Sequence, residues 1–188
     1  PVEGARVVVQ GFGNVGAVSA RLAHAAGARV VAVSDVQSGI HDPRGIDLPA
    51  LDRWVAEHRT VEGFPGAEPV SNADLLTLPC DVLIPAAIQG QITGANAPQL
   101  KCRLMVEGAN GPSDLDADRI LAQRGIMVVP DILANAGGVT VSYFEWVQSL
   151  QHFFWSEDEV NARLTQLMTK AFADVLATAQ QRGVDLRT

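Results

Sequence analysis

Hydrophobic positions divide the chain into short apolar runs and longer periodic segments. The runs "RVVVQ" at 6–10 and "ARVVAVSD" at 28–35 are apolar on both faces, which is typical of central strands in a parallel sheet. Between them, apolar residues recur at helical spacing: Val15, Val18, Leu22 and Ala26. Gly27 is expected to end this helix, because glycine readily adopts the left-handed conformation at a helix C-terminus. The pattern predicts a βαβ unit within roughly 30 residues.

The next part of the chain is less regular. The segment 40–58 predicts a short extended piece and then a helix that Asp47 caps. The stretch "GFPGAEPVS" has the composition of a loop, and Ser71 at its end is expected to cap a short helix. A strand is predicted at 81–84 and is expected to break at Pro85.

Strands and helices continue to alternate in the second half. The stretch "CRLMVEGANGP" predicts a strand followed by a loop, and a helix is expected from Asp114 to Gly125. "IMVVPDILANAGG" predicts a strand that runs into a glycine-rich turn. A long helix is expected to begin at Ser156, which stands at capping-box spacing from Glu159, and to end at Gly183. The apolar face of this helix is predicted from five residues: Val160, Leu164, Leu167, Ala171 and Val175.

This alternation predicts the α/β class, with a Rossmann-type doubly wound and mostly parallel sheet that carries helices on both faces. A single dinucleotide-binding domain over residues 1–188 is the expectation, because 188 residues suit one large domain better than two small ones. The 47% share of hydrophobic residues suits a buried parallel sheet. The formal net charge of −7 argues against non-specific nucleic-acid binding.

Composition also bears on compartment, membrane and metals. No apolar run approaches the length of a membrane span, and no secretory signal pattern opens the chain, so no membrane partner is expected and the cytoplasm is the expected compartment. Cys80 and Cys102 favour reduced, buried thiols over a disulfide. The four histidines lie far apart in the sequence, so no metal site is predicted.

Gly11, Gly13 and Gly16 stand in G-x-G-x-x-G spacing directly after the first predicted strand. In such a turn the first glycine allows a sharp bend, the second lets backbone approach a diphosphate, and the third lets the helix pack on the strand. A helix N-terminus also offers unpaired N–H groups to an anion. The alternative is a plain turn between strand and helix. The preceding strand, the following helix and Asp35, 19 residues beyond Gly16, favour a dinucleotide site.

Asp35 at the tip of the second strand is expected to accept hydrogen bonds from the hydroxyls of the adenosine ribose. A carboxylate in this position repels a 2′-phosphate, and no Arg or Lys follows within eight residues. NAD is therefore favoured as the cofactor. NADP stays possible, because Arg44 or a basic residue outside the chain would offset the charge.

Ligands of doubly wound sheets lie across the carboxyl ends of the strands. Three loops follow predicted strands there: "PAAIQG", "EGANGP" and "ANAGG". Asn110 and Asn135 lie in corresponding positions of the last two loops, and an asparagine amide pairs with a ribose hydroxyl or with the nicotinamide carboxamide. The alternative is that both asparagines merely suit turns.

These motifs resemble the C-terminal, cofactor-binding domain of the glutamate/leucine/phenylalanine/valine dehydrogenase family. The resemblance rests on "VQGFGNVG", "AVSD", "GFPGAE", "CDVLIPAA", "VEGANGP" and "PDILANAGGVTVSYFEWVQ", in the family's order and spacing. It covers essentially the whole chain. It implies reversible oxidative deamination of an amino acid to a 2-oxo acid and ammonia, with hydride passing to the nicotinamide.

The resemblance also implies which residues meet cofactor and substrate. The cofactor contacts would be Gly11, Phe12, Gly13, Asn14, Val15, Gly16, Asp35, Ala86, Ala87, Asn110 and Asn135. Ser142 would bind the distal carboxylate of glutamate, and Val139 would line the same pocket. Relatives specific for leucine or phenylalanine carry an apolar residue in place of this serine, so L-glutamate and 2-oxoglutarate are the favoured substrate pair.

The family's catalytic lysines and its acid/base aspartate belong to an N-terminal domain with a glycine- and lysine-rich segment. The only lysines here are Lys101 and Lys170, and neither has glycine neighbours, so no catalytic residue is expected in this chain. The chain is therefore expected to be a fragment that binds NAD(H) without turnover. The resemblance implies a homohexamer for the parent enzyme.

Six aromatic residues crowd into positions 143–155, and several of their rings are expected to be exposed where the parent enzyme would cover them. Two alternative functions remain. One is a domain of a leucine, phenylalanine or valine dehydrogenase. The other is a non-catalytic, nucleotide-sensing Rossmann module, which would explain the missing lysines but leaves "ANAGGVTVS" without a purpose.

Overall fold

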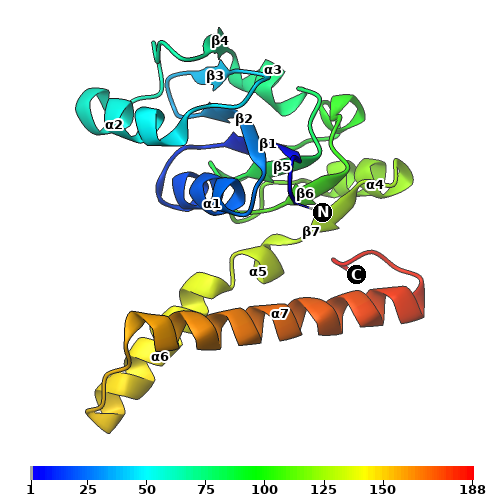
Figure 1. Cartoon of the computed structure of the whole chain (residues 1–188). Coiled ribbons are helices and arrows are strands. Elements are labelled where there is room, and N and C mark those ends of the chain that lie inside the picture. Colours follow the sequence, from blue (N-terminus) through cyan, green and yellow to red (C-terminus); the bar gives the residue numbers. More distant parts are fainter. Residues whose placement is uncertain (1) are drawn as a thin grey trace.

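The computed structural model describes residues 2–188 and contains one seven-stranded sheet with the order β4-β3-β2-β1-β5-β6-β7 (Figure 1). The strands are β1 (Arg6–Gln10), β2 (Arg29–Ser34), β3 (Gly39–His41), β4 (Glu68–Val70), β5 (Val82–Pro85), β6 (Leu104–Val106) and β7 (Met127–Val129). Strands β2, β1, β5, β6 and β7 are parallel, while β3 and β4 pair antiparallel at one edge. The predicted fold class is confirmed.

The helices are α1 (Asn14–Ala25), α2 (Leu48–His58), α3 (Asn72–Leu76), α4 (Leu115–Gln123), α5 (Asp131–Ala134), α6 (Gly137–Gln151) and α7 (Glu157–Arg182), with a 3₁₀ turn at Ala97–Gln99. In Figure 1 the long helix α7 runs beneath the sheet and pairs with α6 at one end. The expected caps are all present: Asp47, Ser71, Asp114 and Ser156 each accept a hydrogen bond from a backbone amide in the first turn of their helix.

Alternation along β1 builds two hydrophobic cores. Val7 and Val9 pack on one face of the sheet with α1 and α2, whereas Val8 packs on the other face with α3 and α4. Side chains of a strand point alternately to opposite faces, so a strand apolar at every position is covered by helices on both sides.

The chain changes direction across the sheet between β1 and β5. From β1 it continues to β2 on one side, and β5 lies on the other side of β1. The loops after β1 and β5 therefore diverge from adjacent strand ends, which is where doubly wound sheets bind their ligands.

The buried face of α1 differs from the predicted one. Val15, Val18 and Leu22 are exposed, and the helix turns Gly16, Ala17 and Ala20 to the sheet. Small residues allow the helix axis to approach β1 closely, and this contact outweighs the burial of the three larger side chains.

Three local predictions were wrong. The predicted loop at 63–71 contains the edge strand β4. The predicted turn after β7 is instead the short helix α5 followed by the start of α6 at Gly137. Pro85 does not break β5 but is its last residue, paired with Gln10.

Candidate functional site

The glycine loop joins the end of β1 to the start of α1. Gly11 has φ +91°, and a Cβ atom on it would lie 2.8 Å from the carbonyl oxygen of Ala86, so only glycine fits here. The amide of Gly11 donates to the Ser34 hydroxyl at 3.3 Å, which ties the loop to the end of β2. A Cβ on Gly16 would overlap the carbonyl oxygen of Gly11. The first and third glycines are thus required by packing.

Gly13 is different from its two partners. It is exposed, its φ is −92°, and a Cβ atom on it would meet no atom within 4 Å. Gly13 is also the N-cap of α1, and no side chain caps this helix in the part of the chain that the structure describes. The first amides of α1 therefore lack an intrahelical partner and carry the positive end of the helix dipole. This combination suits an anion held against the backbone.

The neighbouring loop residues take distinct positions. The ring of Phe12 is buried in the core beside α1, so only the backbone of this residue is left to contact a ligand at the loop. Asn14 and Val15 are exposed in the first turn of α1. The loop therefore presents backbone and small side chains to an incoming ligand.

A cleft of about 880 Å³ opens beside the start of α1. Its lining includes six of the predicted site residues: Val15, Ala86, Ala87, Asn110, Asn135 and Val139. It also includes four residues that the sequence did not single out: Ile88, Gln89, Gly108 and Ala109. A Cβ on Gly108 would lie 3.1 Å from the Cβ of Ala86 and 3.2 Å from a methyl group of Val15, so a side chain at this position would crowd the lining of the cleft.

Asn110 and Asn135 meet at this cleft from two different loops. The side-chain amide of Asn135 donates to the Asn110 side-chain oxygen at 2.6 Å and to the Gly108 carbonyl at 3.5 Å. Asn110 keeps its own amide group, and Asn135 keeps its carbonyl oxygen, for a ligand. Together the pair offers one donor and one acceptor group, which matches the needs of a carboxamide.

Asp35 lies directly after β2, and its carboxylate already accepts four hydrogen bonds. One oxygen accepts from the amides of Gln37 and Ser38 at 2.8 and 3.0 Å. The other accepts from the Thr60 hydroxyl and the Val61 amide, each at 2.7 Å. Burial raises the pKa of Asp35, but the hydrogen bonds lower it further, so the pKa lies below its usual value. The carboxylate is charged at neutral pH and fixes the β2–β3 turn.

This arrangement bears on the predicted ribose contact of Asp35. A carboxylate offers about four acceptor sites, so a ribose hydroxyl would have to share an occupied oxygen. Arg44, the basic residue that would offset the charge, pairs with Asp42 at 3.1 Å. The backbone amide of Asp42 donates a hydrogen bond to the carbonyl of Val31, in the first half of β2, whereas Asp35 follows the last residue of β2. Arg44 therefore lies toward the opposite end of the strand from Asp35.

The two predicted substrate residues lie on α6. Val139 is 70% exposed and lines the cleft beside Asn135. Ser142 is exposed three residues later, so it lies on the same helix face one turn further on, outside the residues that line the cleft.

Glu107 is a buried charged residue that the sequence did not single out. Glu107 follows β6, is fully buried and binds Arg187, 80 residues away; a charged residue directly after the apolar strand "LMV" was the available signal. Burial raises the pKa of the Cys80 thiol to about 12, so this buried, unpaired thiol is protonated.

Within residues 2–188 no cluster of His, Cys, Asp and Glu is arranged to hold a metal ion. No helix in this range is both long and apolar enough to cross a membrane.

The expected exposure of the aromatic segment is confirmed. Tyr143, Trp146, Phe153 and Phe154 are each more than half exposed. Phe144 is buried and meets Trp155 edge to face at 5.5 Å between ring centroids. Exposed aromatic rings that gather on α6 and the turn after it are a common feature of interaction sites.

Fold and site together define a Rossmann-type α/β domain with its glycine loop at the point where the strand order reverses. The family model described as Glutamate/Leucine/Phenylalanine/Valine dehydrogenase matches residues 1–188. The chain belongs to this family.

Curated relatives and solved structures agree with this assignment. The chain is 53% identical over 185 residues to a glutamate dehydrogenase of Thermotoga maritima, and 48% identical over 187 residues to the cryptic catabolic NAD-specific glutamate dehydrogenase GudB of Bacillus subtilis. These matches cover 98% and 99% of the chain but 44% and 43% of the two relatives. A crystal structure of hetero-hexameric glutamate dehydrogenase from Thermus thermophilus superposes with a TM-score of 0.93 at 36% identity, over 100% of this chain and 44% of that one. The chain thus spans less than half the length of the proteins it matches.

Proposed function

We propose that the chain is the NAD-binding domain of a glutamate dehydrogenase. The geometry around Gly13 is the observation that supports this most directly. Gly11 and Gly16 are glycines because the fold leaves no room for a side chain, whereas Gly13 faces open space at an uncapped helix N-terminus. A glycine that packing does not require is explained by the close approach of a ligand, and a diphosphate is the anion this loop suits.

The proposed cofactor lies along the carboxyl ends of the strands. The amides at Gly13 and Asn14 would hold the diphosphate, and the turn that Asp35 fixes would border the adenosine ribose. The nicotinamide would enter the cleft, where Asn110 and Asn135 offer a donor and an acceptor to its carboxamide. The bound nicotinamide supplies the hydride acceptor for oxidation of an amino acid.

NAD is the proposed form of the cofactor. The Asp35 carboxylate is charged, and Arg44 is engaged by Asp42 toward the far end of β2, so a 2′-phosphate would meet uncompensated negative charge. The relatives from Bacillus subtilis and Staphylococcus aureus carry NAD-specific in their names. Direct acceptance of ribose hydrogen bonds by Asp35 stays a prediction.

L-Glutamate and 2-oxoglutarate with ammonia are the proposed substrate and products. Val139 lines the cleft that would hold the nicotinamide, and Ser142 is exposed one helical turn away. A hydroxyl favours a polar substrate side chain over that of leucine, because an unpaired buried hydroxyl costs about 1–3 kcal/mol. The catalytic lysines and aspartate expected from the family resemblance would lie in the part of the relatives' length that this chain does not span. Oxidation of leucine rather than glutamate by the complete enzyme would favour the alternative, a branched-chain or aromatic amino-acid dehydrogenase.

The exposed aromatic surface supports a place within a larger protein. We propose that the parent enzyme covers the exposed rings of Tyr143, Trp146, Phe153 and Phe154, and that the parent assembles as a hexamer in the cytoplasm. The structure from Thermus thermophilus is described as a hetero-hexameric glutamate dehydrogenase, which supports a hexameric parent.

Titration of the chain with NADH and with NADPH tests the proposal. Nicotinamide fluorescence should report saturable binding of NADH, at least tenfold tighter than that of NADPH. Incubation with glutamate and NAD should give no NADH above background. Absence of NADH binding would refute the proposed function. Steady NADH production by the chain alone would refute the proposal that the catalytic residues lie outside this chain. Binding of an adenine nucleotide without the nicotinamide half at equal affinity would favour the nucleotide-sensing alternative.

A further inference from the structure

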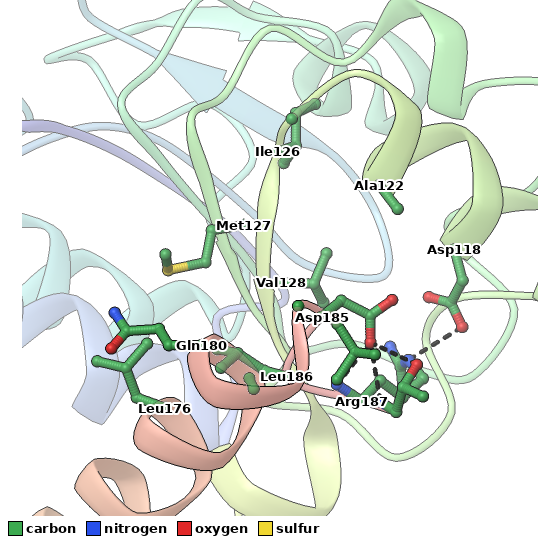
Figure 2. Close-up of a pocket in the computed structure, with 15 residues that line it drawn as sticks. Asp118, Ala122, Ile126, Met127, Val128, Leu176, Gln180, Asp185, Leu186 and Arg187 are labelled. Atoms are coloured by element: carbon green, nitrogen blue, oxygen red, sulfur yellow. Dashed lines mark hydrogen bonds and ion pairs between the residues drawn. The ribbon is translucent and has the colours of Figure 1, made fainter.

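Arg187 near the C-terminus binds three carboxylates with three different nitrogens. Its Nη2 lies 2.7 Å from Glu107, its Nε lies 2.9 Å from Asp118 and its Nη1 lies 3.7 Å from Asp131. Figure 2 shows the guanidinium joined to Asp118 in the wall of a cavity of about 640 Å³ that α4, β7 and the end of α7 line. A planar guanidinium directs its nitrogens outward in fixed directions, so one arginine can serve three partners at once.

Two of these carboxylates belong to the loops that carry the asparagine pair. Glu107 precedes Asn110 by three residues, and Asp131 begins the short helix α5 that ends beside Asn135. The second oxygen of Glu107 accepts the amide of Asp131 at 3.0 Å, so the two loops are also joined directly.

Both carboxylates hold the loop around Asn110 in place. Glu107 accepts from the Ser113 hydroxyl at 2.6 Å, and Asp131 accepts from the Gly111 amide at 2.7 Å. Asn110 thus sits in a segment fixed before and after it by the same two acids that Arg187 draws together. Glu107 is fully buried, so without Arg187 its carboxylate would lose its only cationic partner among the described residues.

We infer that Arg187 is a positioning residue for the nicotinamide end of the cleft. By clamping Glu107 to Asp131 it sets the separation of the two loops and keeps the amides of Asn110 and Asn135 at 2.6 Å. This inference rests on the proposed function, since it assigns the asparagine pair to the nicotinamide carboxamide. It adds a residue that lies outside the cleft lining and 52 positions beyond Asn135.

The test compares two ligands that differ only in the nicotinamide. NADH and ADP-ribose are titrated into the 188-residue chain, its Arg187→Gln and Arg187→Lys variants, and the matched control Arg119→Gln. Arg119 is an exposed arginine whose ion pair with Asp116 stays within α4, so its loss leaves both loops untouched. Arg187→Gln should weaken NADH binding at least tenfold and ADP-ribose binding less than threefold. Arg187→Lys should fall between, because an ammonium cannot meet three carboxylates.

A purely structural role would lower the melting temperature and change both affinities by the same factor, and that result overturns the inference. Equal affinities in the Arg187→Gln variant and the wild type overturn it as well. If Arg187→Gln does not fold, the same comparison is made with Arg187→Lys, for which a NADH loss exceeding the ADP-ribose loss supports the inference and equal losses overturn it. Failure of the wild type to bind NADH refutes the proposed function itself, and the inference with it.

A second measurement needs no ligand. The side-chain amide resonances of Asn110 and Asn135 should shift in Arg187→Lys and stay in place in Arg119→Gln. Unshifted resonances in Arg187→Lys, together with unchanged NADH affinity, would overturn the clamp.

Discussion

The α-carbon of Gly16 packs directly against the carbonyl oxygen of Gly11, so that a methyl group on Gly16 would overlap this oxygen. This contact explains why α1 lies so close to β1. Gly16→Ala should displace the helix or the loop and lower the free energy of unfolding by about 1–3 kcal/mol, the usual cost of overpacking a tight site. Urea denaturation followed by circular dichroism measures this loss. A variant as stable as the wild type would contradict the described packing.

Asp35 should stabilise the fold independently of any ligand. Asparagine in its place would leave two of the four donors without an acceptor, because its amide nitrogen accepts no hydrogen bond, at a cost of about 1–3 kcal/mol for each. Because the pKa of Asp35 is lowered in the fold, its stabilisation is present above the unfolded carboxyl pKa of about 3.9 and is lost as pH falls through the lower folded value.

Unfolding free energies measured between pH 6 and pH 3 test this dependence. Asp35→Asn should be less stable than the wild type at pH 6, and the gap should narrow below about pH 4. Asp116→Asn, a change at an exposed carboxylate, serves as the control. A gap that does not change with pH would count against the assigned role of the charge.

Asp118 should behave in the opposite way. Burial raises its pKa, and the nearby Glu107 and Asp185 add to this, while the Arg187 guanidinium opposes it. A carboxyl with a raised pKa stabilises the fold in its protonated form, and this contribution is lost as pH rises through the folded value. Since the folded environment disfavours the charged form of Asp118, Asp118→Asn should be at least as stable as the wild type at pH 7. An Asp118→Asn variant that is less stable than the wild type in thermal or urea unfolding would show that the ion pair with Arg187 outweighs the burial of the charge.

The apolar surface on α6 and the following turn should make the chain prone to self-association. Phe153 and Phe154 are 64% and 75% exposed, so replacing both with serine removes apolar area without opening a core cavity. The double variant should bind less of a hydrophobic dye and sediment closer to the monomer mass, with unfolding free energy within about 0.5 kcal/mol of the wild type. Unchanged dye binding would mean that these rings are covered in solution.

Features that depend on neighbouring residues were predicted well from the sequence. The caps Asp47, Asp114 and Ser156 act within one turn of their own helix, so the local pattern contains the whole interaction. The glycine loop is likewise local. Its three residues sit between one strand and one helix, and their spacing alone placed the turn correctly.

Features that depend on distant partners could not be predicted in this way. Helical spacing identified α1 but not its buried side, because Gly16, Ala17 and Ala20 face the sheet only through their fit to it. The three-residue edge strand at Glu68–Val70 contains a proline and no alternation, so only its pairing with β3 defines it. The side chain of Arg187 binds Glu107, which lies 80 positions earlier in the sequence, and no local pattern predicts such a contact.

The central claim is that the backbone at Gly13 receives the diphosphate of NAD, and the NADH affinity of the Gly13→Ala variant tests it most directly. The fold has room for this methyl group. Alanine is a poorer N-cap than glycine, but it also reduces the conformational freedom of the unfolded chain, and these two effects on stability oppose each other. The free energy of unfolding should therefore change by less than about 1 kcal/mol. With the fold intact, the dissociation constant for NADH should rise at least tenfold. A folded Gly13→Ala variant that binds NADH as tightly as the wild type would contradict the account.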